Sequence, residues 1–178
     1  MQLVIELPSR NEQMTFNRRR WSEICADTQL AKWPGKVETN AHGQILMSPP
    51  PSGIHSSRQG EITFLLRSLL GGRALPECPV STVDGVRSAD VGWYSESRFA
   101  LVQGQSAFEI APEICVEILS PSNTPFEMRE KRHLYFEAGA REVWICDEGG
   151  LLSYFTSPTA SEPLPTSPLC PAFPSQVA

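Results

Sequence analysis

Hydrophobic and polar positions follow patterns that predict a sheet with helices packed on it. Residues 37–39 (VET) and the apolar run 45–47 (ILM) flank Gly43, which predicts a β-hairpin with its turn at this glycine. From residue 62 to residue 70 the leucines and one isoleucine recur at helical spacing. We expect an amphipathic helix here that begins near Ser56, ends at the following pair of glycines and buries one face.

The second half of the chain predicts strands on either side of another helix. Residues 86–93 and 114–119 are strand candidates, and the second is apolar on both faces apart from one acid. Residues 124–127 (TPFE) have the form of a capping box with proline at the first helical position, and Gly139 ends this helix. Residues 143–146 form a further buried strand. This order predicts an α/β fold with a mixed central sheet flanked by helices, after an N-terminal hairpin.

The length of 178 residues favours one domain, since domains typically contain about 150 residues. Between Pro158 and Pro174 six prolines lie among serine, threonine and alanine, a composition that sustains neither a helix nor a central strand. We therefore predict a folded domain at residues 16–155, an N-terminal extension at residues 1–15 and an extended or disordered tail at residues 156–178.

Composition narrows the range of functions. Fifteen basic against twenty acidic residues give a net charge of −5, which argues against a protein that coats nucleic acid but is compatible with a bound divalent cation. The five cysteines form no CxxC pair, and no apolar run reaches the roughly 18 residues that span a bilayer. We therefore expect free thiols, a cytoplasmic protein and no membrane contact. The chain has no glycine-rich nucleotide motif, so no organic cofactor is expected.

Glu117 is an unusual residue for its position in the strand predicted at residues 114–119. It shares a strand face with Cys115 and Leu119, so its carboxylate lies among apolar neighbours. An ionised acid at such a place needs a cation, a metal or a hydrogen-bond network. The alternative is an acid at the strand end that reaches solvent or pairs with an arginine.

Asp90 and Lys131 are the other two candidates. Aspartate is a poor strand former, so Asp90 is either a functional acid or a residue of a turn or strand end. The spacing of Lys131 from Met128 and Tyr135 places it on the apolar stripe of its helix, unless its side chain extends along the helix edge to water. Two acids and an inward lysine suit metal-assisted phosphodiester cleavage, in which carboxylates bind magnesium and lysine stabilises charge on phosphorus.

Several segments between residues 37 and 147 together resemble the motifs of one known family. They are PEICVEILSPS (112–122), EK (130–131), LY (134–135), EAG (137–139), REVWICD (141–147), the hairpin with ILMSPP (45–50), and His55 at the head of the first helix. This set is similar to the "DLVVEVLSPS" strand, "EK...Y...GV" helix and "EYWLVD" strand of the Uma-type family of restriction endonuclease-like proteins.

The resemblance implies a restriction-endonuclease-like fold of the PD-(D/E)XK superfamily. By this resemblance Asp90 and Glu117 are the metal-binding acids, and Lys131 takes the role of the superfamily's catalytic lysine. Glu38 matches an additional acid at the edge of the catalytic site. Tyr135 is expected either to support the site residues or to pack in the core, and packing is favoured. The expected cofactor is Mg²⁺, for which Mn²⁺ can substitute, and the expected partners are DNA and a second copy of the chain.

Two function hypotheses follow. The first is a divalent-metal-dependent DNA endonuclease that hydrolyses phosphodiester bonds with Asp90, Glu117, Lys131 and Glu38. The second is a nuclease fold with weak or no catalysis that serves as a DNA-binding or protein-interaction module, and the acidic net charge favours it modestly.

Overall fold

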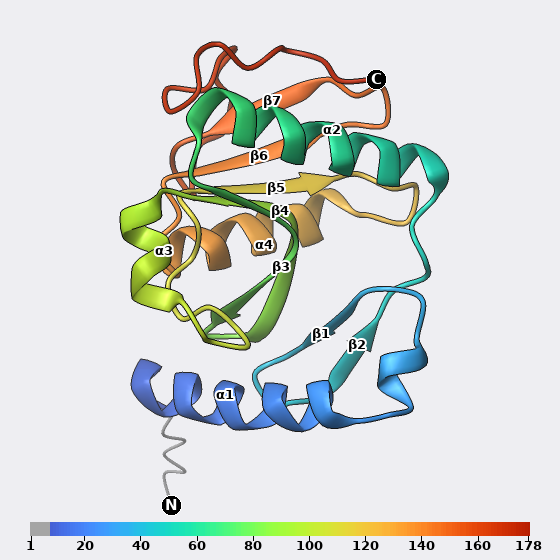
Figure 1. Ribbon diagram of the computed structural model, residues 1–178, viewed down its shortest axis with the longest axis vertical. Coiled ribbons are helices and arrows are strands. Elements are labelled where there is room, and N and C mark those ends of the chain that lie inside the picture. The colour runs from blue at the N-terminus through green and yellow to red at the C-terminus, as the bar shows by residue number, and fades with distance from the viewer. Residues whose placement is uncertain (1–7) are drawn as a thin grey trace, which may run out of the picture.

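The computed structural model describes residues 8–178, which form a five-stranded sheet with helices on both faces and a separate two-stranded hairpin (Figure 1). The helices are α1 (Arg10–Ala26), α2 (Gly53–Leu70), α3 (Glu96–Val102) and α4 (Pro125–Glu137), with the short 3-10 helix η1 (Leu30–Lys32). The strands are β1 (Val37–Thr39), β2 (Ile45–Met47), β3 (Arg73–Thr82), β4 (Gly85–Tyr94), β5 (Ile114–Ile118), β6 (Glu142–Cys146) and β7 (Leu152–Phe155). The predicted α/β architecture with an N-terminal hairpin is confirmed.

The sheet is mixed and has the strand order β3-β4-β5-β6-β7. Only β5 and β6 run parallel, and α4 forms the crossover between them, as a parallel pair requires. The predicted start of α4 is confirmed, since Thr124 Oγ1 accepts a hydrogen bond from Glu127 N (3.1 Å) and Pro125 is the first helical residue. Helix α2 begins earlier than predicted, at Gly53, because Ser52 caps its N-terminus.

Two apolar clusters lie on opposite faces of the sheet. Ile62 and Leu66 of α2 pack against the face that carries Ile114 and Val116. Tyr135 of α4 packs on the other face, with Cys115 and Val143 among its neighbours in that cluster. A third cluster joins α1 to the hairpin and the start of β4, so these elements form one end of the molecule, away from the C-terminal residues (Figure 1).

Helix α1 differs from the predicted N-terminal extension at residues 1–15. Residues 1–7 lie outside the described part of the chain, but the helix begins at Arg10, where Ser9 and Glu12 form a capping box. Its buried face is partly polar, because the Asn17 amide donates to Ser81 Oγ (3.0 Å) and Thr82 O (2.8 Å) of β3. The apolar periodicity of a core helix is therefore missing, although α1 is an integral part of the domain.

Residues 156–178 also differ from the prediction, because they pack on the sheet. They contain no helix or regular strand, but Cys170, Phe173 and Val177 are buried in the cluster beneath α2. The rings of Phe173 and Trp144 lie 4.8 Å apart. This part of the chain is ordered by side-chain packing, which the proline-rich composition does not exclude.

One buried carboxylate ties these C-terminal residues to the sheet. Glu142 of β6 is 1% exposed, and its oxygens accept from Ser167 Oγ (2.6 Å), Leu169 N (2.6 Å) and Trp144 Nε1 (2.7 Å). Hydrogen bonds of this kind satisfy a charge that would otherwise be costly to bury. Within residues 8–178, no helix is both long enough and apolar enough to cross a membrane.

We expect Glu142→Ala to lower the free energy of unfolding by about 2–4 kcal/mol, because three donors, two of them buried, lose their acceptor. Urea denaturation measures this loss, and hydrogen exchange should show reduced protection of the Leu169 amide. Glu148→Ala, at an exposed position of the next turn, is the matched control and should leave both quantities unchanged. Equal urea midpoints for Glu142→Ala and the unmodified protein would contradict this role.

Candidate active site

Four buried charged residues meet where β4 and β5 separate. Val91 pairs with Val116, so the next residues in this register, Asp90 and Glu117, lie opposite each other on neighbouring strands. Glu38 comes from β1 and Lys131 from α4. All four residues are nearly inaccessible to solvent: Glu38 (7% exposed), Asp90 (2%), Glu117 (4%) and Lys131 (7%). Together with Lys36, which is described below, they form what we call the charged cluster.

Lys131 connects two of the carboxylates. Its Nζ lies 3.0 Å from Glu38 Oε1 and 3.2 Å from Glu117 Oε2. Glu38 Oε1 also accepts from the backbone N of Ser88 (2.8 Å), which orients this carboxylate toward the sheet. Lys131 therefore points inward from the stripe of α4 rather than along the helix edge, and Glu117 pairs with a lysine rather than with solvent or an arginine.

Tyr135 does more than the packing expected from the sequence. Its ring is fully buried, and its hydroxyl donates to Glu117 Oε1 at 2.6 Å. Tyr135 lies one turn after Lys131 in α4, so both donors reach the same carboxylate from the same helix face.

Lys36 is a fifth member of the charged cluster, and no sequence pattern indicated it. Its Nζ contacts Asp90 Oδ1 and lies 3.0 Å from Ser88 O. The other Asp90 oxygen accepts from Ile118 N (2.7 Å) and lies 3.4 Å from Nε2 of His55. Lys36 precedes β1 in a loop with no periodic pattern. Of the partners of Asp90, only His55 was therefore noted in the sequence, through the family motif.

The surroundings lower the pKa of two of the three acids and raise the pKa of the third. Burial raises the pKa of Asp90, but Lys36 and the hydrogen bond from His55 outweigh it and hold this pKa well below its usual range. For Glu38 burial is likewise outweighed, by Lys131 and Lys36, and the pKa is lowered. Burial raises the pKa of Glu117 despite the neighbouring Lys131. Glu117 is thus the acid of the cluster that takes up a proton most readily.

The lysines remain charged. Burial lowers the pKa of Lys131, but Glu117 and Glu38 together raise it above its ordinary value. The pKa of Lys36 is raised further, because Asp90 and the other acids outweigh its burial. Two ammonium groups therefore face three carboxylates inside the domain.

The donor set suits a hard divalent cation, because Asp90 and Glu117 offer carboxylate oxygens from adjacent strands. In the arrangement described, however, Lys36 contacts one Asp90 oxygen and Lys131 lies within 3.4 Å of both Glu117 oxygens. Among residues 8–178 no three His, Cys, Asp or Glu side chains are placed to hold a metal ion together. The carboxylates thus have the chemistry of magnesium ligands, and in this structure their charged partners are the two lysines.

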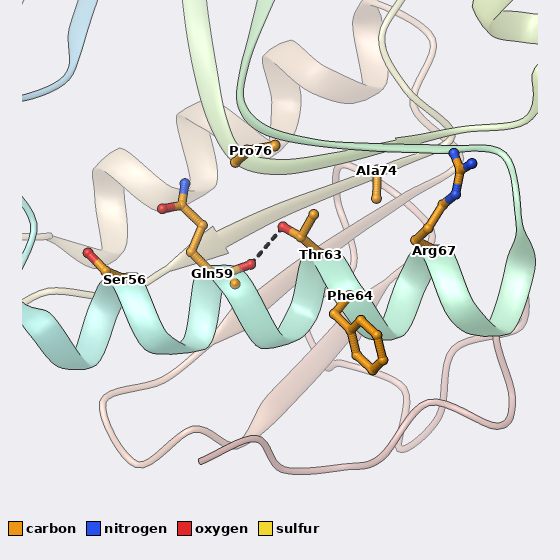
Figure 2. A pocket seen from close by; sticks show the side chains of 8 residues that line it. Ser56, Gln59, Thr63, Phe64, Arg67, Ala74 and Pro76 are labelled. Carbon is orange, nitrogen blue, oxygen red and sulfur yellow. Dashed lines mark hydrogen bonds between the residues drawn. The ribbon is translucent and has the colours of Figure 1, made fainter.

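A groove of about 530 Å³ lies beside the cluster, between α2 and the edge strand β3 (Figure 2). Gln59 connects the two, because its Nε2 donates to the backbone O of Asp90 (2.8 Å) and to Glu77 Oε1 (2.8 Å). The walls mix polar and apolar side chains, among them Ser56, Gln59, Thr63, Phe64, Arg67 and Pro76.

Comparison with known proteins identifies one family and one fold. The sequence matches the Uma2 family model, described as "Putative restriction endonuclease", over residues 27–177, which includes most of the proline-rich segment. A crystal structure described as a "putative nuclease belonging to DUF820", from Anabaena variabilis ATCC 29413, is similar with a TM-score of 0.64. Sequence identity is 21%, over 77% of this chain and 84% of the other, and the predicted restriction-endonuclease-like fold is confirmed. No curated protein matches the sequence.

We expect Tyr135→Phe to lower the free energy of unfolding by about 1.5–3 kcal/mol, because Glu117 loses a hydrogen bond to a buried charge. Tyr94→Phe is the matched control, since it removes a hydroxyl that donates to a neutral carbonyl, Ile110 O, at 2.8 Å. That loss should be about 0.5–1.5 kcal/mol. Urea denaturation of both variants makes the comparison, and a smaller effect at Tyr135 than at Tyr94 would contradict the role of its hydroxyl.

Proposed function

This chain belongs to the Uma2 family, and on that premise we propose that it is a divalent-metal-dependent DNA endonuclease. The observation that carries the proposal is the convergence of Asp90, Glu117 and Lys131 in one buried cluster from two strands and a helix. Packing alone favours apolar side chains at such positions, because burying charged groups is costly. The family match supports nuclease chemistry as the reason why charged side chains occupy these buried positions.

Each residue of the cluster has a role in this proposal. Asp90 and Glu117 would hold Mg²⁺ or Mn²⁺, which supplies charge neutralisation at the phosphate and an activated water. Lys131 remains cationic and stabilises negative charge that develops on the phosphoryl oxygens. Glu38 holds the Lys131 ammonium in place, and Tyr135 does the same for the Glu117 carboxylate.

The groove between α2 and β3 is the proposed path of the DNA backbone. It adjoins the cluster through Gln59, and the hydroxyls of Ser56 and Thr63 with the Arg67 guanidinium are groups that contact phosphate and sugar in protein–DNA complexes. Because the net charge of the protein is −5, its overall electrostatic field does not attract DNA. Such local contacts are therefore the more important source of affinity.

The alternative function is a DNA-binding or protein-interaction module with weak or no catalysis. One observation favours it: Lys36 and Lys131 already pair with the three carboxylates, so each buried acid has a counter-ion without a metal. This alternative needs no divalent ion and predicts that the protein binds partners equally well with a chelator present.

We expect the purified protein to nick supercoiled plasmid with Mg²⁺ or Mn²⁺ and to lose this activity in EDTA. Glu117→Gln and Lys131→Met should each lower the nicking rate by about 100-fold or more, because each removes a group that stabilises the transition state. Glu148→Gln makes the same charge change as Glu117→Gln at an exposed site and should keep full activity.

Circular dichroism and urea denaturation of each variant separate loss of chemistry from loss of folding. DNA binding without cleavage, unchanged by EDTA and by Glu117→Gln, would reject the endonuclease in favour of the binding module.

We also propose that the protein acts as a cytoplasmic homodimer. Cleavage of both strands of a duplex uses two active sites, which a two-fold symmetric pair supplies. The five cysteines are unpaired, as in proteins of a reducing compartment. Light scattering coupled to size exclusion should give twice the mass of one chain, and a mass of one chain at micromolar concentration would contradict the dimer.

A further inference from the structure

Lys36 is the cationic partner of Asp90 in this structure. Its Nζ contacts Asp90 Oδ1 and also donates to Ser88 O at 3.0 Å. The Lys36 side chain is 15% exposed and that of Asp90 3%, so the contact is shielded from bulk water. An ammonium group at this place substitutes for a metal ion as the partner of the acid.

The backbone at Lys36 is fixed, whereas its side chain is long and flexible. Ser48 N donates to Lys36 O (3.0 Å), which holds the residue against the hairpin. At Gly35 an added Cβ would lie 2.0 Å from Ser48 O, so the chain approaches β2 as closely as only glycine allows. The lysine stem has four flexible carbons, and the ammonium can therefore change partners without movement of the loop.

A second acceptor lies within reach of Lys36. Glu77 Oε2 is 3.8 Å from Nζ, and the Glu77 side chain is 47% exposed at the edge of the cluster. Glu77 is the described non-glycine residue with positive φ (48°), and Gln59 Nε2 donates to its carboxylate at 2.8 Å. The ammonium thus lies between the buried Asp90 carboxylate, which it contacts, and the more exposed Glu77 carboxylate.

We propose that Lys36 is a built-in counter-ion, which occupies the cation position at Asp90 and moves to Glu77 when a divalent ion binds. This inference rests on the proposed function. Its physical basis is charge balance: the three carboxylates of Glu38, Asp90 and Glu117 are neutralised by Lys131 together with a divalent ion. If Lys36 stayed at Asp90, the cluster would carry an excess positive charge, and the ion would lie beside a like charge.

The consequence is competition between Lys36 and the metal. Each metal-binding event has to displace a paired ammonium, so the apparent affinity for the ion equals the intrinsic affinity multiplied by the fraction of molecules in which Lys36 has left Asp90. Without metal, the cluster stays folded, because Lys36 and Lys131 remain paired with its carboxylates.

Titration calorimetry with Mn²⁺ on the full chain tests the competition. Lys36→Gln should bind Mn²⁺ at least about tenfold more tightly than the unmodified protein, because the competing cation is gone. Lys32→Gln removes an exposed lysine from η1 and should leave the affinity unchanged. Equal or weaker binding by Lys36→Gln, with clear binding by the unmodified protein, overturns the inference and leaves the proposed function standing. If neither protein binds Mn²⁺, both are overturned.

A measurement on the unmodified protein keeps the inference testable if Lys36→Gln does not fold. Acetylation of individual lysines by an N-hydroxysuccinimide ester, followed by mass spectrometry, reports how accessible each ammonium is. Saturating Mn²⁺ should raise the labelling rate of Lys36 several-fold, with the rate of Lys32 unchanged. Mn²⁺ binding that leaves the Lys36 rate unaltered would show that the lysine stays at Asp90, and this overturns the displacement.

Discussion

The need to neutralise buried carboxylates governs how this domain is assembled. Asp90 and Glu117 lie opposite each other at the fork of two central strands, and neither can stay ionised there without a cation. The cations come from elsewhere in the chain, Lys36 from the loop before the hairpin and Lys131 from α4. The hairpin, the sheet and α4 are therefore held in register by charge pairing as well as by apolar packing, and a small shift of any of them would leave a charge unpaired.

The sequence predicts best those elements whose local signals agree with their tertiary surroundings. For α4, the Thr124 cap, Pro125 and the apolar stripe all indicate the same helix, and this helix carries Lys131 to the cluster. Strand β3 was not predicted because Pro76 and Pro79 interrupt it, which an edge strand tolerates. Lys36 could not be predicted as a partner of Asp90, because the contact spans 54 residues and depends on how the hairpin docks on the sheet.

Helix α1 and the C-terminal residues escaped prediction for a related reason. Both are held by buried polar contacts, Asn17 to β3 in one case and Glu142 to Ser167 and Leu169 in the other. Apolar periodicity does not record such contacts, and proline content excludes regular structure without excluding order. In each case the deciding partner lies far along the chain, so composition within the segment carries no information about it.

The path of the C-terminal residues has a consequence for self-association. The outer edge of β7 is partly covered, because Leu164 forms a bridge with Tyr154 and Gln176 with Leu151. At the opposite edge, β3 is interrupted by its prolines and is bridged to Phe108 at Val80. Exposed strand edges are templates on which chains stack into insoluble cross-β deposits. Loss of the final twenty or so residues would uncover β7, and a truncated chain of this kind should aggregate more readily than the full chain during refolding and storage.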